Sequence, residues 1–147
     1  MPTPNQIDLV QPDYTITEEN LLEVHQGTRT ESGLRHNIRV GIRYIESWLR
    51  GIGCVPLYNL MEDAATAELS RAQVWQWLHF QVEVDKSPLT MDRFLKIIDE
   101  EMFRIQSEVD GEAFANGKFM QACQLFVELS TSPIFEDFLT IKAYDLL

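Results

Sequence analysis

The stretch Thr28-Arg-Thr-Glu-Ser-Gly-Leu-Arg-His-Asn-Ile-Arg-Val-Gly-Ile-Arg-Tyr-Ile-Glu-Ser-Trp-Leu-Arg-Gly51 decides the fold class of this chain. Its apolar residues recur three or four positions apart, which is the spacing of one face of an α-helix. They are Leu34, Ile38, Gly41, Ile42, Ile45, Trp48 and Leu49. Thr28-Arg-Thr-Glu31 has the form of a capping box, and Gly51 is a typical stop. The stretch therefore predicts a helix of roughly 20 residues, about 30 Å long.

A second helix is expected after the glycines and the proline of Gly51–Pro56. Asn59 can cap it, which would place Glu62 and Asp63 in its first turn, where acidic residues favour the helix dipole. The small residues Ala64, Ala65 and Ala67 follow, and a second capping box predicts a kink near Ser70.

The C-terminal half shows the same pattern. Residues 81–89 are polar and predict a loop or a small hairpin. Thr90 caps a helix that extends to Val109, and a further helix runs through 119 to about 129. Pro133 at a first helical position predicts a short helix over Ile134 to Leu139. The fold class is therefore all-α, with five or six helices.

Length and proline content define the domain organisation. With 147 residues, the chain is long enough for one core and too short for an eight-stranded barrel. Residues 1–27 contain three prolines and predict an extended lead-in or strap, with a short helix after Thr17. Residues 28–147 form the helical domain.

Charge excludes some partners. There are 23 acidic and 12 basic residues, so the net charge is −11. Such a surface repels phosphate groups, so neither nucleic acid nor an anionic membrane is an expected partner. Two cysteines, Cys54 and Cys123, are too few for a disulfide framework and favour a reducing compartment. With no leader pattern, no C-terminal peroxisomal tripeptide and no long apolar run, a cytoplasmic location is expected.

Basic side chains gather on one helix. Arg35, Arg39, Arg43 and Arg50 recur with Glu46 on one stripe of the first long helix, opposite its apolar face. The stripe is interpreted as a solvated helix face; the alternative is contact with an anionic ligand or an acidic neighbouring surface.

Few residues suggest chemistry by spacing alone. His25, His36 and His79 do not have the spacing of a metal site, and no nucleophile triad or phosphate loop is recognisable. Trp75 and Trp77 are interpreted as aromatic residues half packed into the core. From the residues alone, Glu62 and Asp63 are interpreted as dipole or capping residues.

A longer stretch resembles a known family. Cys54-Val-Pro-Leu-Tyr-Asn-Leu-Met-Glu-Asp-Ala-Ala-Thr-Ala-Glu-Leu-Ser-Arg-Ala-Gln-Val-Trp-Gln-Trp77 is similar to the signature of malate synthase. Residues 27–50 resemble the helix before that signature in the A-type enzymes, and Phe135 to Leu147 resemble their C-terminus. The similarity covers essentially the whole chain but only the C-terminal portion of that family.

The resemblance implies a helical C-terminal plug that closes over a TIM barrel, which is absent from this chain. The family condenses acetyl-CoA with glyoxylate and hydrolyses the thioester to give malate and CoA, in the glyoxylate bypass. The barrel would supply the magnesium ligands and the catalytic arginine. The chain alone is therefore expected to be inactive.

The resemblance also assigns roles to three residues. Asp63 falls on the catalytic base, and Leu60 and Met61 fall on residues beside the acetyl-CoA thioester; core packing is the alternative for these two. The acetyl methyl group is a weak carbon acid and needs a positioned base. A rival interpretation is a free-standing helical interaction module that uses the arginine stripe and the Trp75/Trp77 end.

Overall fold

A computed structural model of the chain describes residues 5, 7, 15–24 and 26–147. The described part is mostly helical, which confirms the all-α class. Its helices are α1 (Glu18–Leu22), α2 (Glu31–Leu49), α3 (Ala64–His79), α4 (Met91–Glu108), α5 (Gly111–Asn116), α6 (Phe119–Thr131) and α7 (Leu139–Ala143), with a 3-10 turn over Tyr144–Leu146. The predicted number of five or six was too low, because the short α5 is separate from its neighbours.

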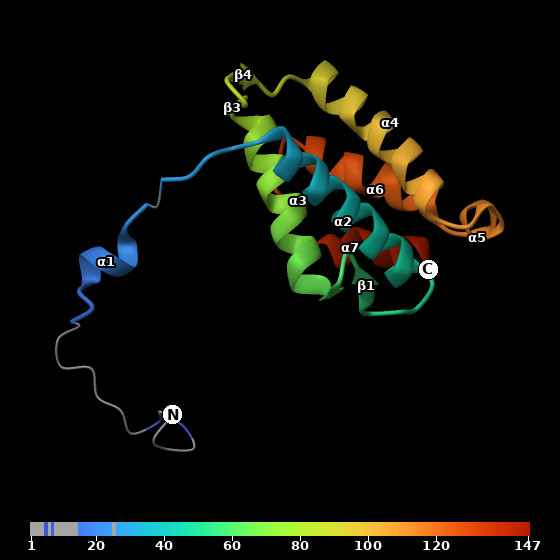
Figure 1. Cartoon of the computed structure of the whole chain (residues 1–147), viewed down its shortest axis with the longest axis horizontal. Coiled ribbons are helices and arrows are strands. Elements are labelled where there is room, and N and C mark those ends of the chain that lie inside the picture. Colours follow the sequence, from blue (N-terminus) through green and yellow to red (C-terminus); the bar gives the residue numbers. More distant parts are fainter. Residues whose placement is uncertain (1–4, 6, 8–14, 25) are drawn as a thin grey trace.

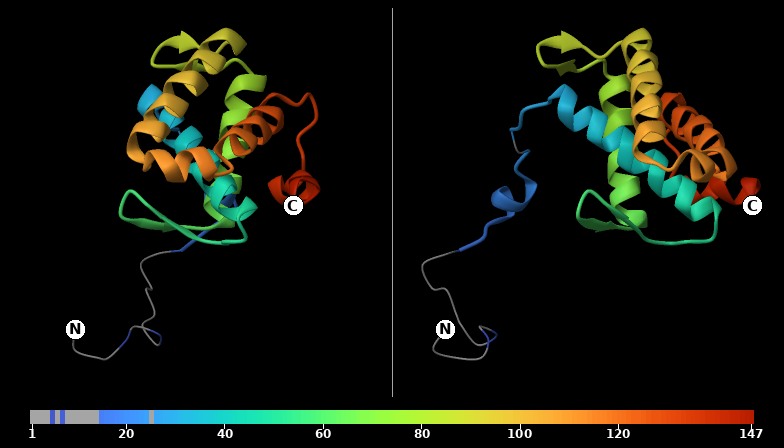
Figure 2. Two further views of the ribbon diagram at one scale, coloured as in Figure 1. Left: turned by 90° about the vertical axis from the view of Figure 1, so that its right-hand side faces the viewer. Right: turned by 45° about the vertical axis from the view of Figure 1, so that its right-hand side comes forward.

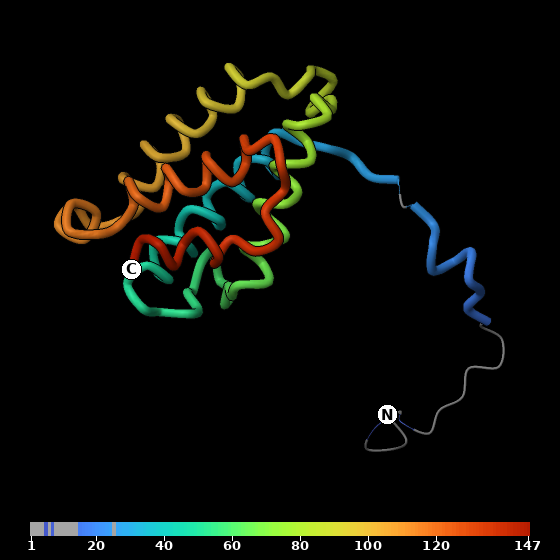
Figure 3. Tube along the Cα trace, turned by 180° about the vertical axis from the view of Figure 1, so that it is seen from behind, coloured from blue at the N-terminus to red at the C-terminus, as the bar shows by residue number. Residues whose placement is uncertain are grey.

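Helix α2 lies at the centre of the fold. It packs against α3, α4 and α6, and α3 also packs against α6 (Figures 1 and 3). Its apolar stripe is buried, with Leu34, Ile38, Ile42 and Ile45 fully inaccessible to solvent. The helix begins two residues later than the expected capping box indicates. Its N-cap is Thr30, whose side chain accepts from the backbone N–H of Gly33.

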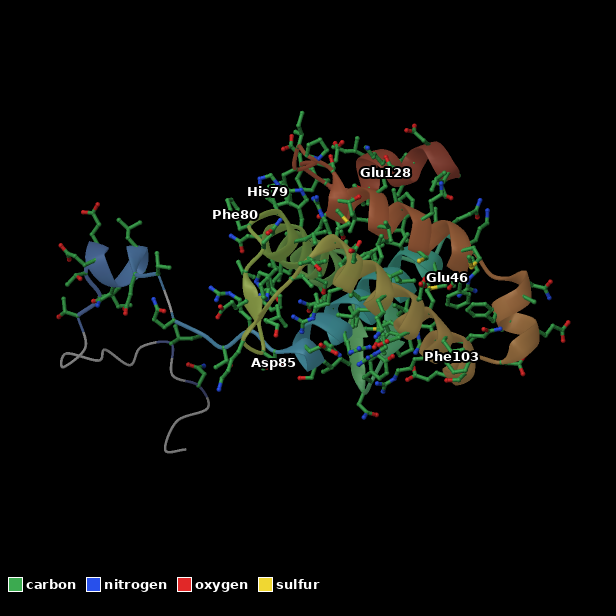
Figure 4. The ribbon with its side chains drawn as sticks, turned by 90° about the horizontal axis from the view of Figure 1, so that it is seen from above. Glu46, His79, Phe80, Asp85, Phe103 and Glu128 are labelled. Carbon is green, nitrogen blue, oxygen red and sulfur yellow. The ribbon has the colours of Figure 1, made fainter. Side chains whose placement is uncertain are left out.

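Two short antiparallel hairpins flank α3 in the sequence and lie at its opposite ends (Figure 2). The first pairs β1 (Val55–Leu57) with β2 (Leu60–Glu62). The second pairs β3 (Glu83–Val84) with β4 (Ser87–Pro88) and confirms the small hairpin predicted within 81–89. Its turn residue Asp85, labelled in Figure 4, accepts a 2.8 Å hydrogen bond from the backbone N–H of Glu31 at the start of α2.

The predicted helix start at Asn59 is wrong. Tyr58 and Asn59 both have positive φ and form the two-residue turn between β1 and β2. A helix therefore does not start at Asn59. The apolar Leu57 is buried in this hairpin. Helix α3 starts only at Ala64, so Asp63 is its N-cap, and it continues to His79 without a break at Ser70.

The predicted helix over Ile134 to Leu139 is also wrong, since α7 begins at Leu139. Carbonyl groups in this segment are bound by side chains instead of by later amides. The Nη2 atom of Arg71 donates to the carbonyls of Glu136 and Asp137, at 2.6 and 3.2 Å. Such side-chain bonds compete with helix formation.

Helix α1 lies apart from the helical body in Figure 1, and residues 15–24 are exposed. The extended part of the predicted lead-in falls largely on residues 1–4, 6, 8–14 and 25, which lie outside the described residues. In the part of the chain that the structure describes, no helix combines the length and the apolar character needed to cross a membrane.

Candidate functional site

The carboxylate of Asp63 is held at the N-terminus of α3 by one of its two oxygens. Its Oδ1 atom accepts hydrogen bonds from the backbone N–H groups of Ala65, at 2.9 Å, and Thr66, at 3.2 Å. The residue is exposed, and no other described residue hydrogen-bonds to its Oδ2 atom. Capping therefore uses one oxygen and leaves the second without a hydrogen-bond partner among the described residues.

Two apolar residues lie just before Asp63 and face solvent. Leu60 is 60% exposed and Met61 is 66% exposed. Successive strand residues point to opposite faces, so Leu60 and Met61 border the two sides of β2. The structure thus brings the three predicted site residues together at the end of one hairpin, and neither apolar residue belongs to the core.

A groove of about 860 Å³ opens beside this hairpin. Helices α2 and α3 form its walls, and Leu60 and Phe135 border it. Its exposed apolar residues include Leu69, which is 73% exposed on α3. An apolar groove of this size on a small acidic domain is typical of a surface that another part of a protein covers. Its lining residues are His36, Asn37, Leu60, Glu62, Thr66, Leu69, Ser70, Ala72, Gln73, Trp75, Gln76 and Phe135.

Glu62 belongs to this groove, which the sequence interpretation missed. It was expected in a first helical turn, but it is the last residue of β2 and is only 5% exposed. No described residue hydrogen-bonds to its side chain or pairs with it. Strand alternation is the signal that could have found it, because Leu60 and Glu62 share one face of the hairpin.

The arginine stripe of α2 is not a solvated face. Arg35, Arg39 and Arg43 pair with carboxylates of α4, so the acidic neighbouring surface that was the alternative belongs to this same chain. Arg50 pairs instead with Glu46 on α2 itself. Arg39 is buried and its Nη1 atom lies 2.5 Å from Oε2 of Glu101. Arg43 pairs with Glu108 at 3.1 Å. These pairs leave little of the stripe for a separate partner, which weakens the interaction-module interpretation.

The aromatic end of α3 is packed as predicted. Trp77 is buried in the core, and the indole N–H of Trp75 donates to the carbonyl of Ser132 at 2.8 Å. The Trp75 ring also stacks on His79, with ring centres 4.6 Å apart. Figure 4 places His79 and Phe80 together at this end of the helix. Packing within the chain accounts for both tryptophans.

The described residues do not form a metal site. Among them, no group of three or more His, Cys, Asp and Glu side chains is arranged to hold a metal ion. The histidines His36 and His79 make ring contacts with Tyr58 and Trp75.

Comparison with known proteins decides the family. The family model described as "Malate synthase, C-terminal" matches residues 28–147. The chain belongs to the malate synthase family. It is 53% identical to the malate synthase of Myxococcus xanthus over 148 residues, which is 100% of this chain and 27% of that protein.

Plant malate synthases also match nearly the whole of this chain. The glyoxysomal malate synthase of Gossypium hirsutum is 49% identical, over 99% of this chain and 26% of its own length. The malate synthase of Arabidopsis thaliana is 48% identical, over 97% of this chain and 26% of its own length. The chain spans about a quarter of the length of the curated relatives that it matches.

Proposed function

We propose that this chain is the C-terminal part of a malate synthase and that Asp63 is the base that removes a proton from the methyl group of acetyl-CoA. The observation that supports the proposal most is the arrangement of Asp63 itself. It is an exposed carboxylate with one oxygen tied to the α3 N-terminus and the other without a partner among the described residues. Exposed Leu60 and Met61 beside it suit the apolar acyl end of the substrate.

In this mechanism, the Oδ2 atom of Asp63 takes the proton while the C–H bond of the acetyl methyl group breaks. The electron pair moves into the thioester, which gives an enolate whose oxygen needs positive charge nearby. Protonated Asp63 keeps its cap, because Oδ1 remains an acceptor for Ala65 and Thr66. The α3 N-terminus therefore holds the carboxylate in one orientation through both protonation states.

In the proposal, the later steps use groups from outside the described residues. The enolate carbon attacks the aldehyde carbon of glyoxylate, and water then hydrolyses the thioester to release malate and CoA. Among the described residues, no group of three or more His, Cys, Asp and Glu side chains is arranged to hold a metal ion. In the proposal, magnesium and the positive charge for the enolate come from a TIM barrel elsewhere in the longer protein. That barrel would cover the apolar groove beside Leu60.

The compartment is part of the proposal as well. A cytoplasmic location is proposed for this chain, whereas the Gossypium hirsutum relative is named as glyoxysomal. Fractionation of the cells that make the protein would separate the two, since organelle-bound enzyme sediments with the organelles.

A chimera tests the proposed function. This chain replaces the C-terminal quarter of the Myxococcus xanthus relative, to which it is 53% identical. We expect the chimera to form malate from acetyl-CoA and glyoxylate, and the chain alone to form none. Asp63→Asn should lower kcat by on the order of a hundredfold or more, because the amide caps α3 but accepts no proton. A chimera that folds and retains wild-type turnover with Asp63→Asn would contradict the proposal.

A further inference from the structure

The tip of the β1–β2 hairpin carries an unusual residue for its conformation. Tyr58 and Asn59 form the two-residue loop, with φ of 52° and 68°. Loops with two positive φ angles favour Asn, Asp and Gly, because a bulky side chain is disfavoured in this region. Asn59 fits that rule and Tyr58 does not. The β3–β4 loop uses Asp85 and Lys86 at the corresponding positions. The side chain of Tyr58 must therefore gain contacts that offset the unfavourable backbone.

Those contacts come from two helices. The Oη atom of Tyr58 donates a 2.8 Å hydrogen bond to Oε2 of Glu108 on α4. The Nη1 atom of Arg43 on α2 donates to the same Glu108 oxygen at 3.1 Å and to the Tyr58 Oη atom at 3.4 Å. The guanidinium carbons of Arg39 and Arg43 lie 5.4 and 5.6 Å from the centre of the Tyr58 ring. Both distances are within the range of a cation–π contact.

Glu108 is kept in its charged form. Burial alone would raise its pKa, but the hydrogen bonds from Arg104 and Tyr58 outweigh that effect and the pKa lies below its ordinary value. An ionised carboxylate is the stronger acceptor for the Tyr58 hydroxyl. The contact between hairpin and α4 is therefore charge-assisted at neutral pH.

The rest of the hairpin is anchored at its ends. Tyr44 donates through Oη to the carbonyl of Gly53 at 3.1 Å, just before β1. Asp63 caps α3 just after β2. A hairpin of three residue pairs is marginal without further packing, and its tip contacts decide where the segment between these ends lies. That segment includes Leu60 and Met61, which are followed by Glu62 and Asp63.

We propose that Tyr58, Arg43 and Glu108 form a hairpin latch that positions residues 60–63, so that Tyr58 and Glu108 are positioning residues for the base Asp63. The positioning role rests on the proposed function of Asp63. The latch links α4, which contributes no residue to the groove beside Asp63, to the orientation of the substrate-facing edge. Small displacements of a catalytic group cost rate even when the fold is intact.

Hydrogen exchange of the 147-residue chain tests the latch without any assay of activity. Tyr58→Phe keeps the ring and removes only the hydroxyl. We expect amides of residues 55–63 to exchange about tenfold faster, while those of α2 and α3 keep their rates. Glu108→Gln is the second variant, because it keeps the side-chain size. Glu100→Gln is the matched control, since Glu100 pairs with Arg35 on α2 but does not contact the hairpin. Unchanged exchange of 55–63 in both latch variants overturns the latch.

Turnover in the chimera tests the positioning role. We expect Tyr58→Phe and Glu108→Gln each to lower kcat by about tenfold, with the KM for glyoxylate unchanged. The double variant should be no slower than the slower single variant, because Tyr58→Phe removes only the contact that Glu108→Gln already weakens. Wild-type kcat in both single variants, or effects that multiply in the double variant, overturns the positioning role.

Asp63→Asn separates the two proposals. If Asp63→Asn retains turnover, the proposed function fails, and with it the positioning role, whereas the exchange experiment still decides whether the latch holds the hairpin. If Asp63→Asn abolishes turnover and the latch variants retain it, only the positioning role fails.

Discussion

The ring of Phe126 on α6 lies so close to Gly41 on α2 that a Cβ atom at position 41 would come within 2.3 Å of its Cε2 atom. Gly41→Ala therefore forces the two helices apart. We expect the free energy of unfolding to fall by about 1–3 kcal/mol, although Ala is intrinsically the better helix former. Urea unfolding followed by circular dichroism measures the change.

Gly111→Ala is the matched control for that prediction. Gly111 is the first residue of α5, and a Cβ atom there would meet no atom within 4 Å. The control should keep or slightly raise the stability. Equal stability of both variants would mean that α2 and α6 do not approach each other at Gly41.

Glu101 should contribute more to stability than its neighbour Glu100. The side chain of Glu101 is 3% exposed and binds Arg35 and Arg39, at 2.8 and 2.5 Å. Glu101→Ala leaves a buried guanidinium uncompensated, which costs about 3 kcal/mol or more. Glu100→Ala breaks an exposed pair worth about 1 kcal/mol or less. Chemical denaturation of both variants gives the comparison, and similar losses would contradict the buried pairing.

Stability should fall in acid because of Glu31. Hydrogen bonds from Arg93, and then from Arg35, hold the pKa of Glu31 below its ordinary value of 4.5. The unfolded chain therefore binds the proton more readily than the folded chain does. The contribution of Glu31 is present above about pH 4.5 and is lost as the pH falls through the lower folded pKa. Urea unfolding over this range should show a weaker pH dependence in Glu31→Gln, and an identical slope would contradict the shift.

The two thiols should differ in reactivity. Cys54 is exposed before β1, whereas burial, with a smaller effect from Asp99, raises the pKa of Cys123 to about 11. The thiolate is the reactive form. Iodoacetamide at neutral pH should label Cys54 first, and Cys123 only after unfolding. Mass spectrometry of peptides from the labelled chain measures both sites, and early labelling of Cys123 would contradict its burial.

The sequence predicted the long helices because their signals are local. The apolar stripes of α2 and α4 repeat every three or four residues and are bounded by the caps Thr30 and Thr90. Such patterns depend on few distant contacts. The all-α class followed from these patterns, whereas the family resemblance rested on the signature residues Cys54–Trp77.

The hairpin before Asp63 could not be predicted in the same way. Asn59 is a good helix cap and an equally good turn residue, so the local sequence permits both. What decides between them is distant: Tyr58 contacts Arg43 and Glu108, which lie 15 and 50 residues away. The same reason explains the arginine stripe, whose partners on α4 are more than 60 residues from it.

The resemblance selected candidate site residues but did not indicate their geometry. The resemblance selected Leu60, Met61 and Asp63, and the structure places them together at the end of β2. It did not indicate that Glu62 faces the groove, because a helix and a strand send neighbouring side chains in different directions.

The most direct test of the central claim is the exchange of the acetyl methyl protons of acetyl-CoA with solvent deuterium, catalysed by the chimera with a glyoxylate analogue bound. This exchange reports removal of the proton and does not need the later steps. Glu62→Gln is the matched control, because it changes the neighbouring carboxylate and leaves Asp63 in place. Our account predicts rapid exchange in the parent chimera, measurable exchange with Glu62→Gln, and a loss on the order of a hundredfold or more with Asp63→Asn. Exchange at the parent rate in a folded Asp63→Asn chimera would contradict it and would leave Asp63 only as the cap of α3.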